Sequence, residues 1–363
     1  MMSFNPAMVT LAREASEMSQ SDLAREVGVK QSTISKIERG GVVPPPETLA
    51  ALAQALEVPE SLFSQPLEYR QLPVSFYRRR VQVSSYKLKA IRARTNFTRM
   101  HMRTLLKAID IPNLRIVYGD PRGGKAAAIQ CARLVRAHWN LPPGPVRNLT
   151  EVVENAGIIP IPMDFSDAKV DGVSLYDPAD GTPPLLFYNA VALWDRIRFT
   201  LAHEVGHIAL HHHLAIADVE RDHEAEAHAF AGELLMPEAD VKAHLSNLTF
   251  PKLAALKSHW GVAMQALVMR AFHLGKITER QRTYLFMQMS KAGYRTREPV
   301  KINPEPPTLL GEMIGYYLND LKYTEQRLSA ELHMRPFMFR RHYQALSPVR
   351  PAVAGEVRRG ASA

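Results

Sequence analysis

The chain has 363 residues, 46% of them hydrophobic, which is enough for two or three domains with separate cores and excludes a disordered chain. Its formal net charge is +9, and its single cysteine, Cys131, excludes a disulfide framework and a cysteine-based zinc site. Because the sequence shows no signal peptide and no apolar run near about 18 residues, we expect a cytoplasmic protein without a membrane partner.

The first informative segment, residues 19–40, reads SQSDLAREVGVKQSTISKIERG. A turn glycine, Gly28, separates two short amphipathic helices, which is the pattern of a helix-turn-helix. The polar side chains that project from the second helix are Gln31, Ser32, Thr33, Ser35 and Lys36. We therefore predict that this helix reads base edges in double-stranded DNA. A helical module that docks on another protein is the alternative.

Apolar residues at helical spacing continue to Phe63 and complete a five-helix unit, and residues 6–65 resemble the Cro/C1-type, or XRE, DNA-binding domain. Gln20 and Gln31 stand at the two amide positions that are usual in that family. The resemblance implies that Gln20 supports the recognition helix and touches phosphate, whereas Gln31 opens that helix. We expect this domain to span residues 1–67 and to bind an inverted-repeat operator as a homodimer.

A strongly basic stretch follows. Residues 69–109 contain eleven Lys or Arg residues and no Asp or Glu, which exceeds the net charge of the whole chain. We predict a basic helical connector over residues 68–124 that contacts DNA phosphates. The cations nearest the first domain are Arg78, Arg79 and Arg80. The stretch also has apolar residues to bury, so a solvated helix face is an equally good interpretation.

The segment GDPRGGK, residues 119–125, imitates a phosphate-binding loop because it matches G-x-x-x-x-G-K. Ala126 occupies the position of the Ser or Thr hydroxyl that would hold Mg²⁺. We therefore predict a linker loop that leads into a helix over residues 126–139.

From about residue 125 the pattern mixes helices with short strands. We expect a helix at 146–155 and strands at 157–163, 170–176 and 185–192. Together with the helices described next, these elements predict a small α+β unit over residues 125–245.

The segment FTLAHEVGHIALHHH, residues 199–213, contains H-E-x-x-H on an apolar helix. Residues four apart face the same way, about 5–6 Å apart at their β-carbons, so His203 and His207 can hold one Zn²⁺ while Glu204 reaches its water. The alternative is a core helix with two satisfied histidines. We expect the remaining histidines to be solvated at the helix end. They are His211, His212 and His213.

A tetrahedral catalytic zinc site needs a third protein ligand and an open fourth position. The segment HEAEAHAFAGELLMP, residues 223–237, predicts a second helix that offers Glu224 and Glu226. Being two apart on a helix, these side chains point about 200° away from each other. Only one of them can therefore face the metal.

Together, HEVGH and EAEAHAFAGELLMP resemble the ImmA/IrrE family of zinc metallopeptidases, whose pattern is close to HExGH followed by ExEAxxFAxxLLMP. The resemblance implies that Glu224 is the third ligand and Glu204 the general base of a zincin-like fold. His228 stands where the family usually has Asp or Asn. We favour a role for His228 in supporting the ligands, with an extra ligand or a proton donor as alternatives. Tyr176, Tyr188 and His228 are candidate donors to the oxyanion.

The segment LKSHWGVAMQALVMRAFHLGKITERQ is helical in pattern and predicts a helical extension over residues 246–300. After a proline-rich joint at 304–307, we expect residues 301–363 to form further helices and then a disordered tail beyond Ser347. No internal repeat is evident. The expected fold is mainly α, with a small α+β part in the peptidase.

The order of these domains resembles XRE-type regulators fused to an ImmA/IrrE domain. The resemblance implies a transcriptional regulator whose zinc site cleaves a repressor protein, separate or this chain itself, in response to stress or a mobile element. A non-catalytic repressor with a metal- or ligand-sensing or dimer-forming domain is one alternative. An antitoxin-like DNA-binding protein is another. The presence of Glu204 argues against an inactive site, because a structural zinc site needs no general base.

Overall fold

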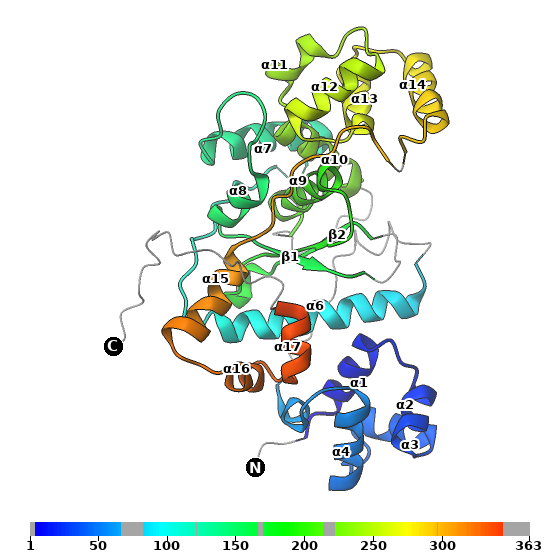
Figure 1. The fold of residues 1–363 in the computed structure, drawn as a ribbon, viewed down its shortest axis with the longest axis vertical. Coiled ribbons are helices and arrows are strands. Elements are labelled where there is room, and N and C mark those ends of the chain that lie inside the picture. The colour runs from blue at the N-terminus through cyan, green and yellow to red at the C-terminus, as the bar shows by residue number, and fades with distance from the viewer. Residues whose placement is uncertain are drawn as a thin grey trace. The chain divides into compact units, whose positions relative to one another are not determined.

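The computed structural model divides the chain into two compact units, which we call the terminal unit and the central unit (Figure 1). The terminal unit takes its residues from 1–72, 80–111 and 308–363, and the central unit takes the remainder, mainly 112–307. The residues whose structure is described are 4–66, 83–120, 122–165, 170–212, 222–295 and 297–343.

The terminal unit begins with five short helices. They are α1 (Pro6–Ala15), α2 (Gln20–Val27), α3 (Gln31–Glu38), α4 (Pro46–Ala55) and the 3-10 helix η1 (Glu60–Ser64). Ser19 and Asp22 form a reciprocal capping box that starts α2. Gly28 ends α2 with a φ of 75°, a left-handed conformation that glycine adopts without strain. The apolar faces of these helices meet in one core, where Leu23 and Ile34 are fully buried.

Helix α6 (Ser85–Leu105) packs on α1 and is more than a solvated connector. Arg92 and Arg94 form ion pairs with Glu14 and Glu17 of the first domain, at 3.2 and 2.7 Å. These two cations therefore serve packing within the terminal unit. The three connector cations Arg78, Arg79 and Arg80 lie outside the described residues.

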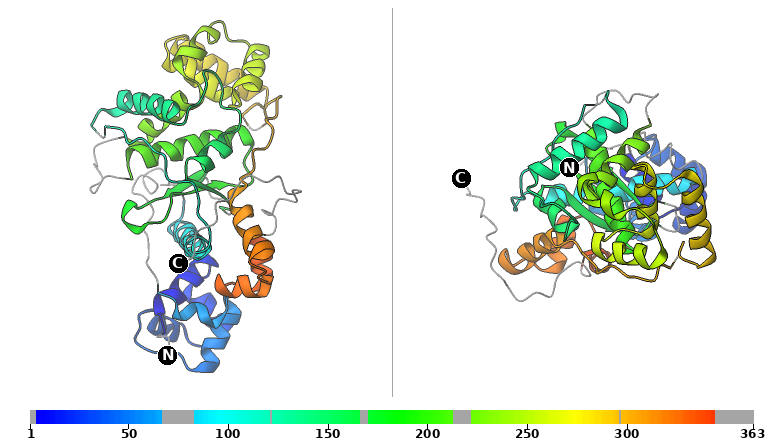
Figure 2. Two further views of the ribbon diagram at one scale, coloured as in Figure 1. Left: turned by 90° about the vertical axis from the view of Figure 1, so that its left-hand side faces the viewer. Right: turned by 90° about the horizontal axis from the view of Figure 1, so that it is seen from above.

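The last helices of the chain return to the terminal unit. They are α15 (Leu309–Gly315), the π-helix η4 (Tyr316–Asp320), α16 (Glu325–Glu331) and α17 (Pro336–Tyr343). Two buried contacts hold them to α6: Tyr317 donates to the carbonyl of Leu105 at 3.2 Å, and Nδ1 of His101 lies 2.7 Å from the Tyr343 hydroxyl. Figure 2 shows α16 and α17, in orange to red, beside the first helices, in blue. The expected tail beyond Ser347 lies outside the described residues.

The central unit contains a three-stranded sheet. Its strands are β1 (Ile159–Met163), β2 (Gly172–Leu175) and β3 (Leu185–Asn189). Helices α7 (Gly124–His138) and α8 (Leu149–Asn155) precede the strands, and the 3-10 helix η2 (Pro178–Asp180) connects β2 to β3. The strand order is β1-β3-β2, with β1 parallel and β2 antiparallel to β3. All three predicted strands are confirmed with shorter bounds, and the glycine-rich loop leads into α7 as expected.

Helix α9 (Trp194–Leu210) packs on β2 and β3, and α10 (His223–Leu235) packs on α9 and α7 (Figure 1). Glycines allow the close approach on both sides of α9. A β-carbon at Gly206 would lie 3.0 Å from Cδ1 of Phe230 on α10. A β-carbon at Gly172 would lie 2.5 Å from Cγ2 of Thr200. Because neither glycine has a side chain, the neighbouring element can pack closely against α9 at each position.

The remaining helices of the central unit are α11 (Glu238–Val241), η3 (Lys242–His244), α12 (Phe250–Trp260), α13 (Met264–His273) and α14 (Glu279–Lys291). Buried ion pairs join this part to α9: Lys257 contacts Asp195 and Glu298, and Arg198 contacts Glu305. Because a buried charge needs a partner, these pairs fix the path of the segment that leads out of the central unit.

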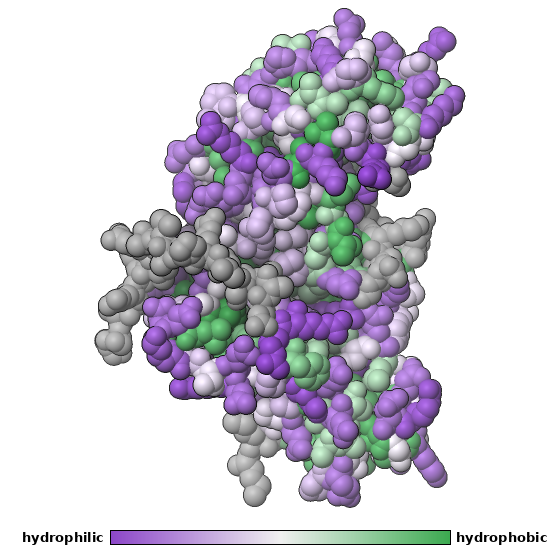
Figure 3. All heavy atoms as spheres, viewed as in Figure 1, coloured by the Kyte–Doolittle hydropathy of each residue, from purple (hydrophilic) through white to green (hydrophobic). Residues whose placement is uncertain are grey.

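The face drawn in Figure 3 shows many hydrophilic side chains, with apolar side chains in smaller groups. Within the described ranges, no helix is both long and apolar enough to cross a membrane. The fold is mainly helical with a small α+β part, which confirms the fold class that the sequence predicts.

Candidate functional site

Helices α9 and α10 bring the three expected metal ligands together. Nε2 of His203 and Nε2 of His207 lie 3.1 Å apart. They lie 3.4 and 3.3 Å, respectively, from the two carboxylate oxygens of Glu224, in the first turn of α10. One ligand atom from each residue can be chosen so that all three lie within 4.8 Å of one another.

Burial sets the charge state of this cluster. The side chains of His203 and His207 are 4% and 6% exposed, and that of Glu224 is 24% exposed. Burial lowers the pKa of His203 to about 3, so its ring is neutral near pH 7. Burial also acts to raise the pKa of Glu224, but its hydrogen bonds with the two histidines outweigh this effect and hold the pKa below its usual range.

The donor chemistry of the cluster fits zinc. Neutral imidazole and ionised carboxylate are the forms that bind a divalent metal. Two imidazole nitrogens and one carboxylate oxygen make up a ligand set that catalytic zinc sites use, with the fourth position open. The three residues that the structure brings together could therefore hold Zn²⁺.

A hydrogen-bonded chain behind His207 fixes the proton on its ring. Nδ1 of His207 lies 2.9 Å from Nδ1 of His211, and Nε2 of His211 lies 3.0 Å from Oε2 of Glu226. Because an ionised carboxylate can only accept, a neutral His211 ring in this contact has its proton on Nε2 and accepts at Nδ1. With His211 in that form, His207 donates from Nδ1, which leaves the lone pair of its Nε2 directed at the candidate metal position.

The expectation that the histidines after α9 are solvated is wrong for His211, and His212 is partly buried with two polar contacts. The side chain of His211 is only 7% exposed, because Glu226 covers it from α10. His212 lies 3.1 Å from the Ser174 hydroxyl through Nε2 and 3.1 Å from the carbonyl of Tyr176 through Nδ1. His213 lies outside the described residues. The spacing of four between His207 and His211 was a signal that could have shown their shared face.

Glu204 is held beside the ligands by the sheet. Its side chain is buried, and the Ser174 hydroxyl of β2 donates to Oε2 of Glu204 at 2.8 Å. The sequence does not mark Ser174, because only the antiparallel pairing of β2 with β3 places it against α9. The hydrogen bond orients the Glu204 carboxylate, a group that can accept a proton as a general base.

The three candidate oxyanion donors occupy different places. Nδ1 of His228 lies 2.8 Å from the carbonyl oxygen of Glu224, and its ring centroid is 4.5 Å from that of His203. His228 is thus placed to support two of the expected ligands. Tyr176 lies with its hydroxyl 3.2 Å from that of Tyr118.

Tyr188 lies on β3 and is buried in the core against Trp194, at a ring distance of 6.3 Å. It pairs across the sheet with Gly172, where a β-carbon would lie 3.5 Å from Cγ of Glu204. Burial raises the pKa of Tyr188, so its hydroxyl stays protonated, as a hydrogen-bond donor must be. Its role as an oxyanion donor stays a prediction.

In the terminal unit, a chain of side chains braces α3. Nε2 of Gln31 donates to Oε1 of Gln20 at 2.7 Å, and Nε2 of Gln20 donates to Glu38 at 2.6 Å. Glu38 also pairs with Arg13 at 2.6 Å. Gln20 therefore holds Gln31 at the start of α3, and its expected contact with phosphate stays a prediction. The exposed members of the predicted reading set are Gln31, Ser32 and Lys36, and Thr33 and Ser35 are partly buried.

Comparison with known families gives a match in each of two parts of the chain. Residues 10–63 match the family model described as helix-turn-helix, and residues 153–272 match the one described as the IrrE N-terminal-like domain. No curated protein matches the chain. The chain therefore joins an XRE-type helix-turn-helix domain to an IrrE/ImmA-like domain, which confirms the predicted fusion.

These matches define the protein as a DNA-binding regulator with a peptidase-like domain. The second family is of metallopeptidase type, which implies a metal cofactor, typically zinc, and suggests a protein substrate. Neither match reaches residues 64–152 or the residues after 272. The domain boundaries at 67, 124, 245 and 300 stay predictions.

Proposed function

We propose that the protein is a zinc-dependent endopeptidase that cleaves a repressor protein, in trans or within its own chain, and so couples a stress or mobile-element signal to transcription. The observation that carries this proposal is the cluster of His203, His207 and Glu224, with the buried Glu204 next to His203 on the same helix and bound by Ser174. A site built only to hold zinc has no need of a carboxylate there and would usually fill the fourth position.

Each residue of the site has a separate task in this proposal. His203, His207 and Glu224 hold Zn²⁺, which when bound would polarise the scissile carbonyl and acidify the attacking water. Glu204 accepts the proton of that water and later passes it to the leaving amine. Ser174 keeps the carboxylate of Glu204 oriented through its 2.8 Å hydrogen bond.

The sheet supports a protein substrate. In the part of the chain that the structure describes, β2 pairs only with β3, so its other edge has backbone groups available for pairing. An extended peptide added to this edge would pass Ser174 and therefore Glu204. The strand thus offers a way to align a peptide with the proposed base.

The test compares the wild-type protein with Glu204→Gln. Candidate repressors encoded nearby, and the protein itself, are incubated with each form and with chelator, and the products are identified by intact mass. Glutamine keeps the shape of the side chain but cannot accept the proton, so cleavage should fall about 10²–10⁴-fold while zinc and DNA binding remain. Chelator should abolish cleavage by both forms.

The same pair of proteins is compared in cells, because a peptidase that needs an activator is silent in the tube. Wild type should relieve repression and Glu204→Gln should not. If both forms relieve or impose repression equally and leave every candidate intact, the endopeptidase proposal is wrong. The non-catalytic sensor would then be the better account.

We further propose that the helix-turn-helix domain binds an inverted-repeat operator as a homodimer, with α3 in the major groove. The exposed face of α3, opened by Gln31, supports this orientation. Sedimentation of the protein with its own promoter tests the stoichiometry, since two chains should bind each operator.

A further inference from the structure

The helices at the end of the terminal unit repeat the path of those at its beginning. Residues 311–343 follow residues 6–38 with a constant difference in residue number. Two residues of each segment adopt the left-handed conformation at corresponding positions. Glu17 (φ 53°) corresponds to Lys322 (φ 56°), and Gly28 (φ 75°) corresponds to His333 (φ 50°). A non-glycine residue rarely adopts this conformation, so the shared positions indicate the same turns.

The helix starts and the core also correspond. The Ser19 side chain accepts the backbone N–H of Asp22 at the start of α2, and the Thr324 side chain accepts that of Arg327 at the start of α16. Corresponding buried residues are Leu23 and Leu328, Ala24 and Ser329, and Ile34 and Phe339.

The turn between the two helices closes through the same backbone hydrogen bond. The N–H of Val29 donates to the carbonyl of Ala24 at 3.0 Å, and the N–H of Met334 donates to that of Ser329 at 2.8 Å. Helices α16 and α17 therefore form a second helix-turn-helix. The expectation of no internal repeat is wrong at the level of structure.

The second helix-turn-helix lacks the polar side chains with which α3 is expected to read bases. Pro336, Phe337 and Met338 stand where α3 has Gln31, Ser32 and Thr33. None of these three side chains can form the hydrogen bonds that distinguish base edges. Positive charge remains further along α17, where Arg340 and Arg341 correspond to Ser35 and Lys36.

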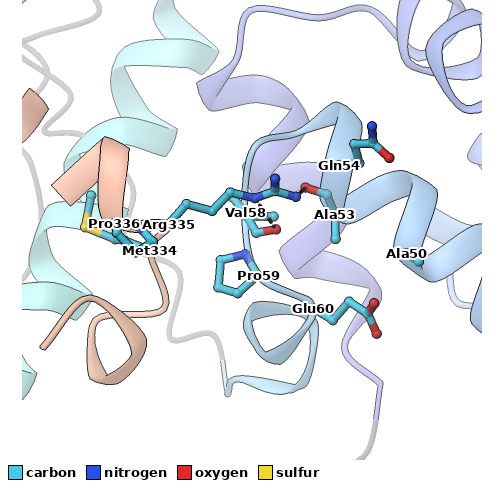
Figure 4. A pocket seen from close by; sticks show the side chains of 9 residues that line it. All are labelled: Ala50, Ala53, Gln54, Val58, Pro59, Glu60, Met334, Arg335 and Pro336. Atoms are coloured by element: carbon cyan, nitrogen blue, oxygen red, sulfur yellow. Dashed lines mark hydrogen bonds between the residues drawn. The ribbon is translucent and has the colours of Figure 1, made fainter. Parts of the chain in front are cut away.

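The first turn of α17 is directed at the first domain. Arg335, just before α17, donates to the carbonyls of Ala53 and Val58 at 2.8 and 3.3 Å (Figure 4). A cavity of about 460 Å³ lies beside this contact, between α4, η1 and the turn before α17. As long as Arg335 makes this contact, the N-terminal end of α17 faces the first domain and cannot insert into a DNA groove.

In the second half of α17, Phe339 and Tyr343 are buried, whereas the side between them faces solvent. Arg340 and Arg341 are both exposed, and the contact of Arg340 with Glu325 is a long, exposed pair at 3.4 Å. An exposed pair of this kind contributes little, so it leaves Arg340 able to exchange partners. Two adjacent exposed guanidinium groups on a helix-turn-helix are complementary to the phosphates of a duplex.

We propose that α16 and α17 form a second DNA-contacting unit that binds the phosphates of duplex DNA through Arg340 and Arg341 and does not read base edges. Phosphate contacts raise affinity for any sequence, whereas base contacts supply the preference. The first helix-turn-helix thus selects the DNA site through α3, and the second helix-turn-helix adds affinity that does not depend on the DNA sequence.

The experiment uses the full-length protein with the double variant Arg340→Ala/Arg341→Ala. Its affinity for a mixed-sequence duplex of about 40 base pairs is measured between about 50 and 200 mM salt. Losing two phosphate contacts should lower the slope of log affinity against log salt by roughly 1.8. The matched control is Arg280→Ala/Lys291→Ala, which removes two exposed cations from the central unit and should keep the wild-type slope.

A third variant separates charge from folding. Arg340→Lys/Arg341→Lys keeps both charges and should retain the wild-type slope, since counterion release depends on charge. Both arginines are exposed, so thermal unfolding of the alanine variant should match wild type. The proposal is overturned if the folded alanine variant keeps the wild-type slope, or if the slope of the control falls by as much. The second helix-turn-helix would then serve only to dock on α4. If the alanine variant unfolds, Arg340→Gln/Arg341→Gln takes its place under the same criteria.

Discussion

Replacing Glu226 with alanine tests the hydrogen-bonded chain behind the candidate metal centre. Glu226 lies on α10 but faces away from the expected ligand set, and its carboxylate contacts Nε2 of His211 at 3.0 Å. Without it, His211 is free to carry its proton on Nδ1, where it would oppose the N–H of His207 at 2.9 Å. His207 would then favour the tautomer that points a proton at the metal.

The expected loss of zinc affinity follows from the role of hydrogen-bond partners that orient a ligating histidine. The variant retains all three expected ligands, so it should still bind about one zinc ion when zinc is in excess. Partners that orient a ligating histidine are typically worth 10–100-fold in metal affinity, or about 1.4–2.8 kcal/mol. Both side chains of the contact are nearly buried, at 7% and 6% exposure, so solvent should not replace the lost partner. We therefore expect the zinc Kd of Glu226→Ala to rise 10–100-fold.

Competition with a zinc chelator of known affinity measures this Kd directly. Glu224→Ala, which removes an expected ligand, should lose much more affinity than Glu226→Ala. Glu279→Ala, on the exposed face of α14, is the matched control and should bind zinc as wild type does. A folded Glu226→Ala protein with an unchanged zinc Kd would refute the role of the chain. A complete loss of zinc from Glu226→Ala but not from Glu224→Ala would instead reverse the ligand assignment.

Three further predictions concern other parts of the chain. Gln31→Ala should lose about 1–3 kcal/mol of preference for the operator over a mismatched site, with an unchanged salt slope, in competition binding assays. Gly206→Ala places a β-carbon 3.0 Å from Phe230 and should lower the free energy of unfolding by about 1–3 kcal/mol in urea titrations. Burial lowers the pKa of His101 to about 3 from an ordinary value of 6.5, so the unfolded chain binds its proton first as pH falls. The free energy of unfolding should therefore drop by about 2 kcal/mol between pH 7 and 5 through this group, and much less in His101→Gln, by urea titration at each pH.

The sequence predicted the grouping of the candidate metal ligands because its signals are local. Spacing along one helix placed His203 and His207 together, and the opposite directions of Glu224 and Glu226 limited the third ligand to one of them. The choice of Glu224 came from family resemblance, and the structure brings that residue to the two histidines. The strands were also predicted, because each is a short apolar run.

The parts that escaped prediction depend on contacts between distant segments. Three consecutive histidines at a helix end suggest solvation, and only the packing of α10 covers His211 with Glu226. Ser174 has no motif, and the pairing of β2 with β3 alone directs it to Glu204. The second helix-turn-helix was hidden because its turn residue is His333 in place of a glycine. Its core also uses Phe339 where the first unit uses Ile34.

The insertion of the central unit between α6 and α15 has a consequence for synthesis. The partners of the first domain in α15 to α17 leave the ribosome roughly 200 residues after α6, about 10–40 s later at 5–20 residues per second. Until then, the carbonyls of Ala53 and Val58 lack the Arg335 side chain. A nascent chain therefore carries its first DNA-reading helices before the contacts that complete the terminal unit exist. The two helix-turn-helix segments can pack together only after the whole chain has been translated. The order of synthesis therefore sets when each part of the regulator can act.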